Sequence, residues 1–224
     1  MKYDVIIVGA GPAGYFAAYE FTKKAPNKKI LLIDKGRDIH TRNCPVLNHT
    51  LEKCPLNKEG FRECYPSCSI TSGFGGAGAY SDGKFNITTE FGGWLGEYMD
   101  SHQLLDLINY VDSINLSFGA TEVITDPHTA KVKEIELRAM SVGAKLLRSK
   151  VRHLGTEENL KILSKIFMYL EDKIEMIFAK KVNDIIVEAS KIKGVILEDN
   201  NIYHADNVVL GVGREGSEWL SNIL

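Results

Sequence analysis

The chain has 224 residues and nearly balanced charge, with 27 Lys and Arg against 29 Asp and Glu. This balance excludes the broad basic surface that binding to nucleic acid or to an anionic membrane requires. A chain of this length buries about 70% of its unfolded surface, enough for one large domain or two small ones. No apolar run reaches the roughly 18 residues of a membrane-spanning helix, and no cleavage pattern follows the apolar start. We therefore expect a cytoplasmic protein with no transmembrane segment.

Residues 3–34 predict a β-strand, a helix and a second β-strand. The run YDVIIV is apolar and largely β-branched, as in a parallel strand that is covered on both faces. A helix is predicted over residues 15–24, with Ala17, Ala18 and Phe21 on its inner face, and the run KILLID predicts the second strand. Together these elements form one βαβ unit.

The turn between the first strand and the helix reads GAGPAG, the G-x-G-x-x-G frame of dinucleotide-binding folds. Gly9 allows the tight turn, Gly11 lets the backbone approach a pyrophosphate, and Gly14 lets the helix pack closely on the sheet. The helix N-terminus then faces the phosphates, and Asp34, twenty residues after Gly14, accepts hydrogen bonds from a ribose. The predicted cofactor-binding residues of this unit are Gly9, Gly11, Pro12, Ala13, Gly14 and Asp34.

All four cysteines fall in an irregular segment after the βαβ unit, at the spacing C-x9-C-x9-C-x3-C. This spacing lacks the C-x2-C pair that is usual in zinc and iron–sulfur sites. In a reducing cytosol free thiols are the simpler interpretation, and a metal site or redox pairing is the alternative. We assign no metal site, and the only candidate ligands are Cys44, Cys54, Cys64 and Cys68.

The segment GFGGAGAYSDGKF, residues 73–85, contains a near match to the P-loop frame G-x-x-x-x-G-K. A P-loop requires Ser or Thr after the lysine and then a helix, whereas Phe85 follows Lys84 and the next residues favour extended structure. A surface for a flat flavin ring explains the glycines better, because they let the backbone lie against the ring and donate N–H groups to it. Lys84 is predicted to stabilise the reduced, anionic ring. The other predicted contacts are Gly75, Gly76, Gly78, Ser81, Asp82 and Gly83.

Helices are predicted near 101–117, 128–141 and 156–172, and the rest of the chain predicts a three-stranded β-meander followed by a last strand. The first meander strand is predicted to run from Val182, placed beside the adenine, to Ser190. Simple NAD-binding folds continue with alternating helices instead, so the meander favours FAD. The remaining predicted cofactor contacts are Lys35, Arg42, Gly213 and Arg214.

We expect an α/β, Rossmann-like fold with a central parallel sheet, organised as one FAD-binding domain over residues 1–224. Its predicted parts are the βαβ unit at 3–34, the Cys/Pro segment with the glycine loop at 35–90, a partly helical insertion at 95–173, and the meander with the last strand at 174–214.

Several features follow one another in a family-like order: VIIVGAGPAG, IDKGRDIHTR, the cysteine segment, GFGGAGAYSDGKF, RHLGT, the meander and VGREGSEWL. In this combination the chain resembles the uncharacterised bacterial FAD-dependent dehydrogenases, relatives of the glutathione-reductase-like flavoproteins. The resemblance implies an FAD-dependent oxidoreductase that transfers hydride between an unknown small-molecule substrate and flavin, with NAD(P)H as candidate electron donor. Family members run to about twice this length. The resemblance therefore implies a truncated or split N-terminal portion that lacks the C-terminal substrate domain, with a partner chain to supply it.

The catalytic residues are left open, with Lys84 and His153 as candidates. His153 is otherwise a packed or solvent-exposed side chain, and Arg42 either reaches the FAD phosphates or lies in solvent. Two other functions stay open beside the oxidoreductase. One is a saturating reductase that resembles the geranylgeranyl reductases, and the other is a non-catalytic dinucleotide-binding module that needs a partner chain.

Overall fold

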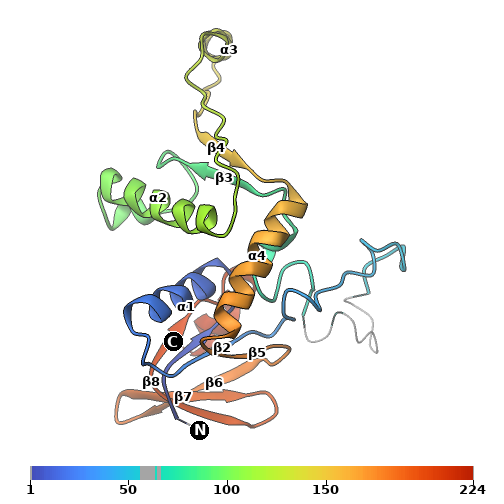
Figure 1. Ribbon diagram of the computed structural model, residues 1–224, viewed down its shortest axis with the longest axis vertical. Helices are drawn as coiled ribbons and strands as arrows, with labels where there is room; N and C mark the ends of the chain where they lie inside the picture. Colours follow the sequence, from blue (N-terminus) through green and yellow to red (C-terminus); the bar gives the residue numbers. More distant parts are fainter. Residues whose placement is uncertain (1, 56–63, 65–66, 224) are drawn as a thin grey trace. The chain divides into compact units, whose positions relative to one another are not determined.

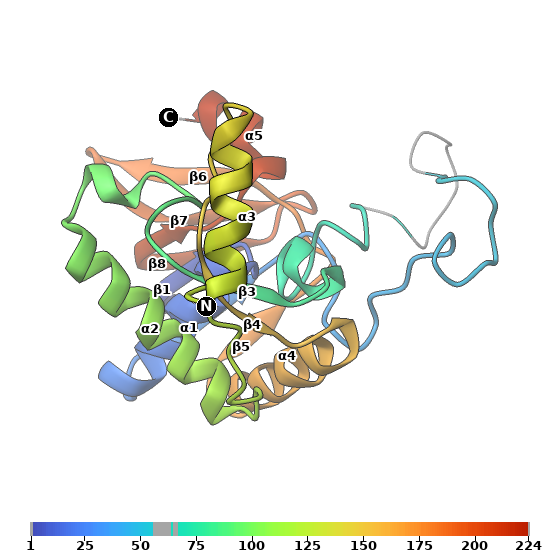
Figure 2. The same cartoon turned by 90° about the horizontal axis from the view of Figure 1, so that it is seen from above.

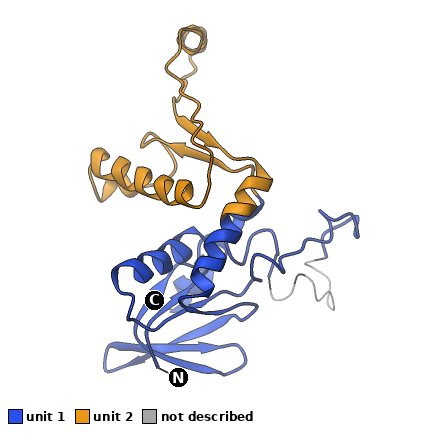
Figure 3. Cartoon of the chain, in the orientation of Figure 1, with its two compact units in different colours: residues 1–80, 163–224 blue, residues 81–162 orange. Residues whose placement is uncertain are grey.

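The computed structural model describes residues 2–55, 64 and 67–223 (Figure 1). The chain divides into a first unit, residues 1–80 and 163–224, and a second unit, residues 81–162 (Figure 3). The second unit is thus inserted between two segments that together build the first.

A six-stranded sheet of order β5-β2-β1-β8-β7-β6 forms the frame of the first unit. Figure 2 shows β6, β7, β8 and β1 following one another in this order. β1 (Lys2–Val8) pairs in parallel with both β2 (Ile30–Ile33) and β8 (Ile202–Leu210), and β5 (Glu175–Ile177) pairs in parallel with β2. All four residues of β2 are buried, because both faces of this parallel part of the sheet are covered. The predicted Rossmann-like fold with a central parallel sheet is confirmed.

The meander forms the antiparallel part of the same sheet. β6 (Val182–Glu188) and β7 (Lys191–Leu197) are antiparallel neighbours, and β7 pairs in turn with the first residues of β8. The predicted end of the first strand at Ser190 is wrong. Ala189 and Ser190 have φ values of 48° and 59°, so they form the two-residue turn of a hairpin. β8 is continuous, so the third meander strand and the predicted last strand are one strand that goes on to pair with β1.

Helix α1 (Pro12–Lys24) begins directly at the fingerprint turn and buries Tyr15 and Ala18. Their i, i+3 spacing places them on one face of the helix. Ala17 and Phe21, which were also predicted for the inner face, are half-buried.

Helix α4 (Thr156–Glu171) confirms the helix predicted over 156–172. Its buried side chains recur at i, i+3 and i+4, as an amphipathic helix requires. The fully or almost fully buried residues in its part of the first unit are Leu163, Ile166, Phe167 and Leu170.

The second unit contains the two-stranded antiparallel sheet of β3 (Lys84–Ile87) and β4 (Lys150–His153), together with α2 (Ser101–Ser117) and α3 (Ala130–Ser141). Both predicted helices are present. Their N-caps are the side chains of Asp100 and Thr129, which accept hydrogen bonds from the first turn of each helix. In the part of the chain that the structure describes, no helix is both long and apolar enough to cross a membrane.

Candidate dinucleotide-binding site

Two glycines of the fingerprint are required by close backbone approaches. Gly9 has a φ of 100°, and a Cβ atom added to it would lie 2.4 Å from the carbonyl oxygen of Gly211 at the end of β8. A Cβ atom on Gly14 would lie 1.7 Å from the carbonyl oxygen of Gly9. The turn, the start of α1 and the end of β8 are therefore in direct contact, and neither position accommodates a side chain.

Gly11 is different, because the fold itself does not require a glycine there. Its backbone is extended, with φ −69° and ψ −176°, and an added Cβ atom would meet only the Cα atom of Gly76, at 4.0 Å. Gly11 is the N-cap of α1, makes no side-chain capping hydrogen bond, and precedes Pro12 at the start of the helix. The N-terminal amides and the positive end of the helix dipole therefore lie beside a position from which a side chain is missing. A glycine at this position lets an anionic group come close to the N-terminal amides of the helix.

The carboxylate of Asp34 joins three loops. Its Oδ2 atom accepts a hydrogen bond from the Ala10 N–H at 2.7 Å, and its Oδ1 atom accepts from the N–H groups of Gly36 at 2.7 Å and Gly73 at 3.0 Å. The side chain is buried, and three of its roughly four acceptor positions are thus used within the protein. Its hydrogen bond to a ribose stays a prediction. The hydrogen bonds within the protein show that Asp34 also holds the three loops together, a role that the fingerprint did not indicate.

Phe74 anchors the glycine loop in the core of the first unit. It is completely buried, and its ring centroid lies 5.5 Å from that of Tyr15 in α1 and 5.1 Å from that of Phe167 in α4. The next residue, Gly75, donates its N–H to the carbonyl oxygen of Ala10 at 2.9 Å. Gly75 and Gly76 therefore lie against the fingerprint turn. Sequence reasoning missed Phe74, although a single aromatic residue among glycines was the available signal.

Arg42 holds the glycine loop in place through hydrogen bonds to the backbone. Its guanidinium donates to four backbone carbonyl oxygens. Nε lies 2.9 Å from the Ser69 oxygen, Nη2 lies 2.8 Å from the Ile70 oxygen, and Nη1 lies 2.6 Å from the Phe74 oxygen and 2.9 Å from the Gly76 oxygen. Burial lowers the pKa of this guanidinium, which remains charged because arginine does not lose its proton in proteins. The interpretation of Arg42 as a solvated loop arginine is wrong, since only 6% of the residue is exposed. Its predicted direct contact with phosphates stays a prediction.

Glu215 connects the end of β8 to the same loop. It belongs to the short 3-10 turn Arg214–Gly216, and its Oε2 atom accepts from the hydroxyl groups of Thr71 at 2.8 Å and Ser72 at 2.5 Å. Its Oε1 atom lies 3.0 Å from Nζ of Lys35, a predicted cofactor contact that is therefore ion-paired. Burial raises the pKa of Glu215, but these bonds more than offset it and leave the pKa lowered. The neighbouring predicted contacts, Gly213 and Arg214, are exposed.

Val182 is the first residue of β6, where it pairs with Leu197. Its side chain is buried in the apolar cluster of the first unit, which also contains Tyr3, Ile6 and Leu31. Gly78 lies in the 3-10 turn Gly76–Tyr80, where an added Cβ atom would meet nothing within 4 Å. The predicted contacts of these two residues with adenine and with the ring stay predictions.

The remaining predicted residues belong to the second unit. Lys84 is exposed and its Nζ atom lies 2.6 Å from Oδ2 of Asp82, while His153 is its cross-strand partner in β4. The Gly83 N–H donates to Oγ of Ser81 at 3.2 Å. A strand follows Gly83 where a P-loop needs a helix, so the rejection of the P-loop is confirmed. The roles of these residues toward a flavin stay predictions.

The cysteines do not form a recognisable centre. Cys44 and Cys64 are buried, Cys54 is exposed and Cys68 lies between these extremes, and no disulfide joins these four residues. Among the residues that the structure describes, no three His, Cys, Asp or Glu side chains are grouped so that they could hold a metal ion.

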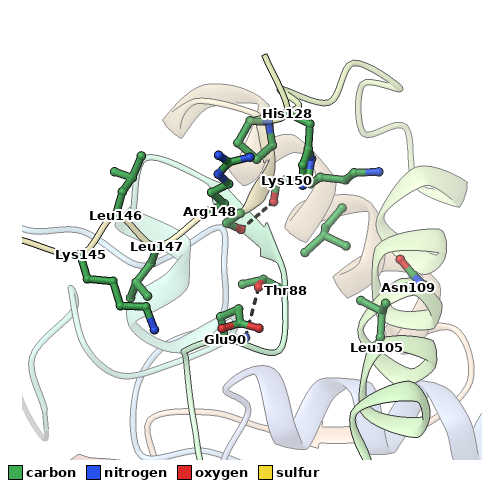
Figure 4. Close-up of a pocket in the computed structure, with 13 residues that line it drawn as sticks. Thr88, Glu90, Leu105, Asn109, His128, Lys145, Leu146, Leu147, Arg148 and Lys150 are labelled. Carbon is green, nitrogen blue, oxygen red and sulfur yellow. Dashed lines mark hydrogen bonds between the residues drawn. The ribbon is translucent and has the colours of Figure 1, made fainter. Parts of the chain in front are cut away.

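The second unit also contains an open pocket of about 480 Å³ (Figure 4). Its basic residues are largely matched by acids, since Arg148 pairs with Glu136 and both His128 and Lys150 pair with Asp126. The predicted site residues do not line it. The pocket therefore gives no support to the predicted cofactor contacts.

The sheet, the fingerprint turn and the uncapped start of α1 define a Rossmann-like fold of the dinucleotide-binding class. The chain belongs to the pyridine nucleotide-disulphide oxidoreductase family, whose sequence profile matches residues 3–138. No curated protein sequence matches the chain.

Several solved enzyme structures are similar to this chain. The 3-ketosteroid-Δ4-(5α)-dehydrogenase from Rhodococcus jostii RHA1 is 14% identical, with a TM-score of 0.52 over 93% of this chain and 45% of that chain. Glycine oxidase from Geobacillus kaustophilus is 16% identical, with a TM-score of 0.48 over 96% and 58%, and L-amino acid deaminase from Proteus vulgaris is 12% identical, with a TM-score of 0.49 over 95% and 47%. The chain spans about half the length of these structures. The similarity to the dehydrogenase supports the assignment of the fold and nothing further.

Proposed function

We propose that the first unit binds FAD and that the protein works as an FAD-dependent oxidoreductase, with hydride transferred between a small-molecule substrate and the flavin. The observation that carries this proposal is Gly11, a glycine that the fold does not need at the uncapped N-terminus of α1. An approaching pyrophosphate explains both the glycine and the open helix end. The meander, which continues into β8, supports FAD over a simple NAD-binding arrangement.

The residues of the first unit then have separate tasks. The amides at the start of α1 bind the pyrophosphate, and Asp34 orients the loops around it while its remaining acceptor position faces a ribose. FAD supplies the hydride chemistry when it is bound, and the protein supplies orientation and charge. In the second unit we retain Lys84 as the proposed cation for the polar edge of the flavin and His153 as a proposed proton-transfer group. We also retain NAD(P)H as the proposed electron donor and the cytoplasm as the proposed location.

We also propose that a further polypeptide completes the substrate site. Large apolar side chains of the second unit are strongly exposed, with 82% for Trp94, 81% for Tyr98 and 79% for Val142. Isolated apolar residues at a surface are ordinary, but larger exposed apolar patches mark sites of interaction with a partner. The chain also spans only 45% of the dehydrogenase structure. Co-purification of a second chain that lowers the reactivity of Trp94 toward an indole-modifying reagent would support this part.

The test of the main proposal is the visible absorption spectrum of the purified protein with and without added FAD. We expect flavin absorption bands to remain with the protein through gel filtration and to bleach anaerobically with NAD(P)H. Bands that remain but do not bleach would retain the FAD site and remove NAD(P)H as the donor. A colourless protein that takes up no FAD would overturn the proposal and favour a non-catalytic module that needs a partner chain.

A further inference from the structure

Arg42 fixes the direction of two peptide groups in the glycine loop. Its Nη1 atom holds the carbonyl oxygens of Phe74 and Gly76. In a planar trans peptide the N–H points away from the carbonyl oxygen, so the N–H groups of Gly75 and Ala77 point away from the guanidinium. For Gly75 the structure shows this directly, because its N–H bonds to the Ala10 carbonyl oxygen in the fingerprint turn. The N–H of Ala77 has the same orientation relative to Arg42, and Ala77 is exposed.

The glycine loop meets the start of α1 at Gly76. A Cβ atom added to Gly76 would lie 3.3 Å from the Cα atom of Gly11 and 3.4 Å from Cδ of Pro12, and Gly76 has a φ of 57°. Ala77 therefore follows directly after the residue that abuts the helix N-terminus. The Ala77 amide thus comes one residue after the contact between the glycine loop and the first turn of α1.

We propose that Arg42 is a positioning residue that aims the Ala77 amide at the anionic group bound by the first turn of α1. The ligand class is a phosphate group of a dinucleotide, so this inference rests on the proposed function. In this proposal Arg42 acts through the loop, in place of the direct phosphate contact that the sequence predicted. The glycine loop thereby adds the Ala77 amide to the backbone donors of the helix N-terminus. The orientation of this amide depends on the forked guanidinium, which bonds several carbonyl oxygens at once.

The test is a titration of the ¹⁵N-labelled full chain with FAD, followed through its backbone amide resonances. We expect the resonances of Ala13, Gly14 and Ala77 to shift together and to saturate at the same FAD concentration. If those of Ala13 and Gly14 shift while that of Ala77 does not, the positioning role is overturned and the FAD site stands. If none of the three shifts, the proposed function itself fails. This measurement on the unaltered chain does not depend on whether any variant folds.

Variants of Arg42 test separately the orientation of the glycine loop and the positive charge of the side chain. Arg42→Lys keeps the charge but loses the fork, and Arg42→Met loses both. We expect both substitutions to weaken FAD binding by about tenfold or more, which is the effect of losing a hydrogen bond to a charged group. Riboflavin binding should change much less, because riboflavin has no phosphate. Arg138→Met, at an exposed position of α3, is the matched control and should bind FAD as the unaltered chain does. Unchanged FAD affinity in Arg42→Lys would overturn the proposal, since charge alone would then be sufficient.

Discussion

The Oδ1 atom of Asp34 lies 3.0 Å from the amide nitrogen of Gly73, 39 residues further along the chain. This bond joins the end of β2 to the start of the glycine loop, and the other carboxylate oxygen holds the fingerprint turn through Ala10. An acid that a fingerprint associates with ribose recognition is therefore also the point at which the loops of the site are assembled.

Asp34→Asn should destabilise the protein, because the NH₂ group of asparagine cannot accept from the backbone N–H groups that the carboxylate now satisfies. A buried donor left without an acceptor costs about 1–3 kcal/mol. We expect a loss of this size in the free energy of unfolding measured by urea denaturation. Asp206→Asn is the control, since Asp206 pairs with Lys2 at an exposed position and its replacement should change the free energy by less than about 1 kcal/mol. Equal unfolding midpoints for the two variants would contradict the assembly role of Asp34.

Gly11→Ala and Gly14→Ala should separate ligand binding from stability. The methyl group at position 11 meets only the Gly76 Cα atom, so the unfolding free energy should change by less than about 1 kcal/mol. FAD affinity should fall at least about tenfold, which is 1.4 kcal/mol. The methyl group at position 14 collides with the Gly9 oxygen, so Gly14→Ala should lose about 3 kcal/mol or more of stability. Thermal denaturation and FAD titration of both variants check this, and a Gly11→Ala protein that binds FAD normally would refute the predicted pyrophosphate position.

Glu215→Gln should change the way in which stability depends on pH. Because the folded-state pKa of Glu215 is lowered, its bonds to Thr71, Ser72 and Lys35 contribute fully above the ordinary value of 4.5 and are lost as the pH falls through the lower folded value. The difference in unfolding free energy between the unaltered chain and the variant should therefore be largest at neutral pH and shrink in acid. Partial exposure limits it to about 1 kcal/mol or less. Urea denaturation across the acid range measures it, and a difference that grows as the pH falls would show that the sign is wrong.

Asp112→Ala should open the second unit locally. Both oxygens of Asp112 accept from Arg152 at 2.7 Å, and Arg152 is 2% exposed. Removal of one partner from a buried pair costs about 3–5 kcal/mol, because the other charge is left buried. Amide hydrogen exchange in α2 and β4 should accelerate accordingly, whereas Glu158→Ala, which removes the exposed pair with Lys161, should leave exchange nearly unchanged. Slow exchange in the Asp112→Ala protein would show that Arg152 finds another partner.

Local pattern was enough to predict the elements of the first unit and the fingerprint turn. The strands are short, uninterrupted apolar runs, and the positions of Gly9 and Gly14 follow from steric rules that act within a few residues. The hairpin turn at Ala189 and Ser190 was missed, because neither residue type signals a positive φ. The continuity of β8 was missed because its pairing changes from β7 to β1 within one strand.

Residues that are neighbours in the chain were sufficient to predict the βαβ unit and the dinucleotide fingerprint and to reject a P-loop. The contacts that hold the glycine loop come instead from residues that only the fold brings together. Phe74 is buried between two helices, Arg42 bonds carbonyl oxygens up to 34 residues away, and Glu215 reaches Ser72 across 143 residues. The physical reason is that a buried charge or ring must find its partners wherever the fold brings them, and no local pattern records which distant backbone groups those partners are.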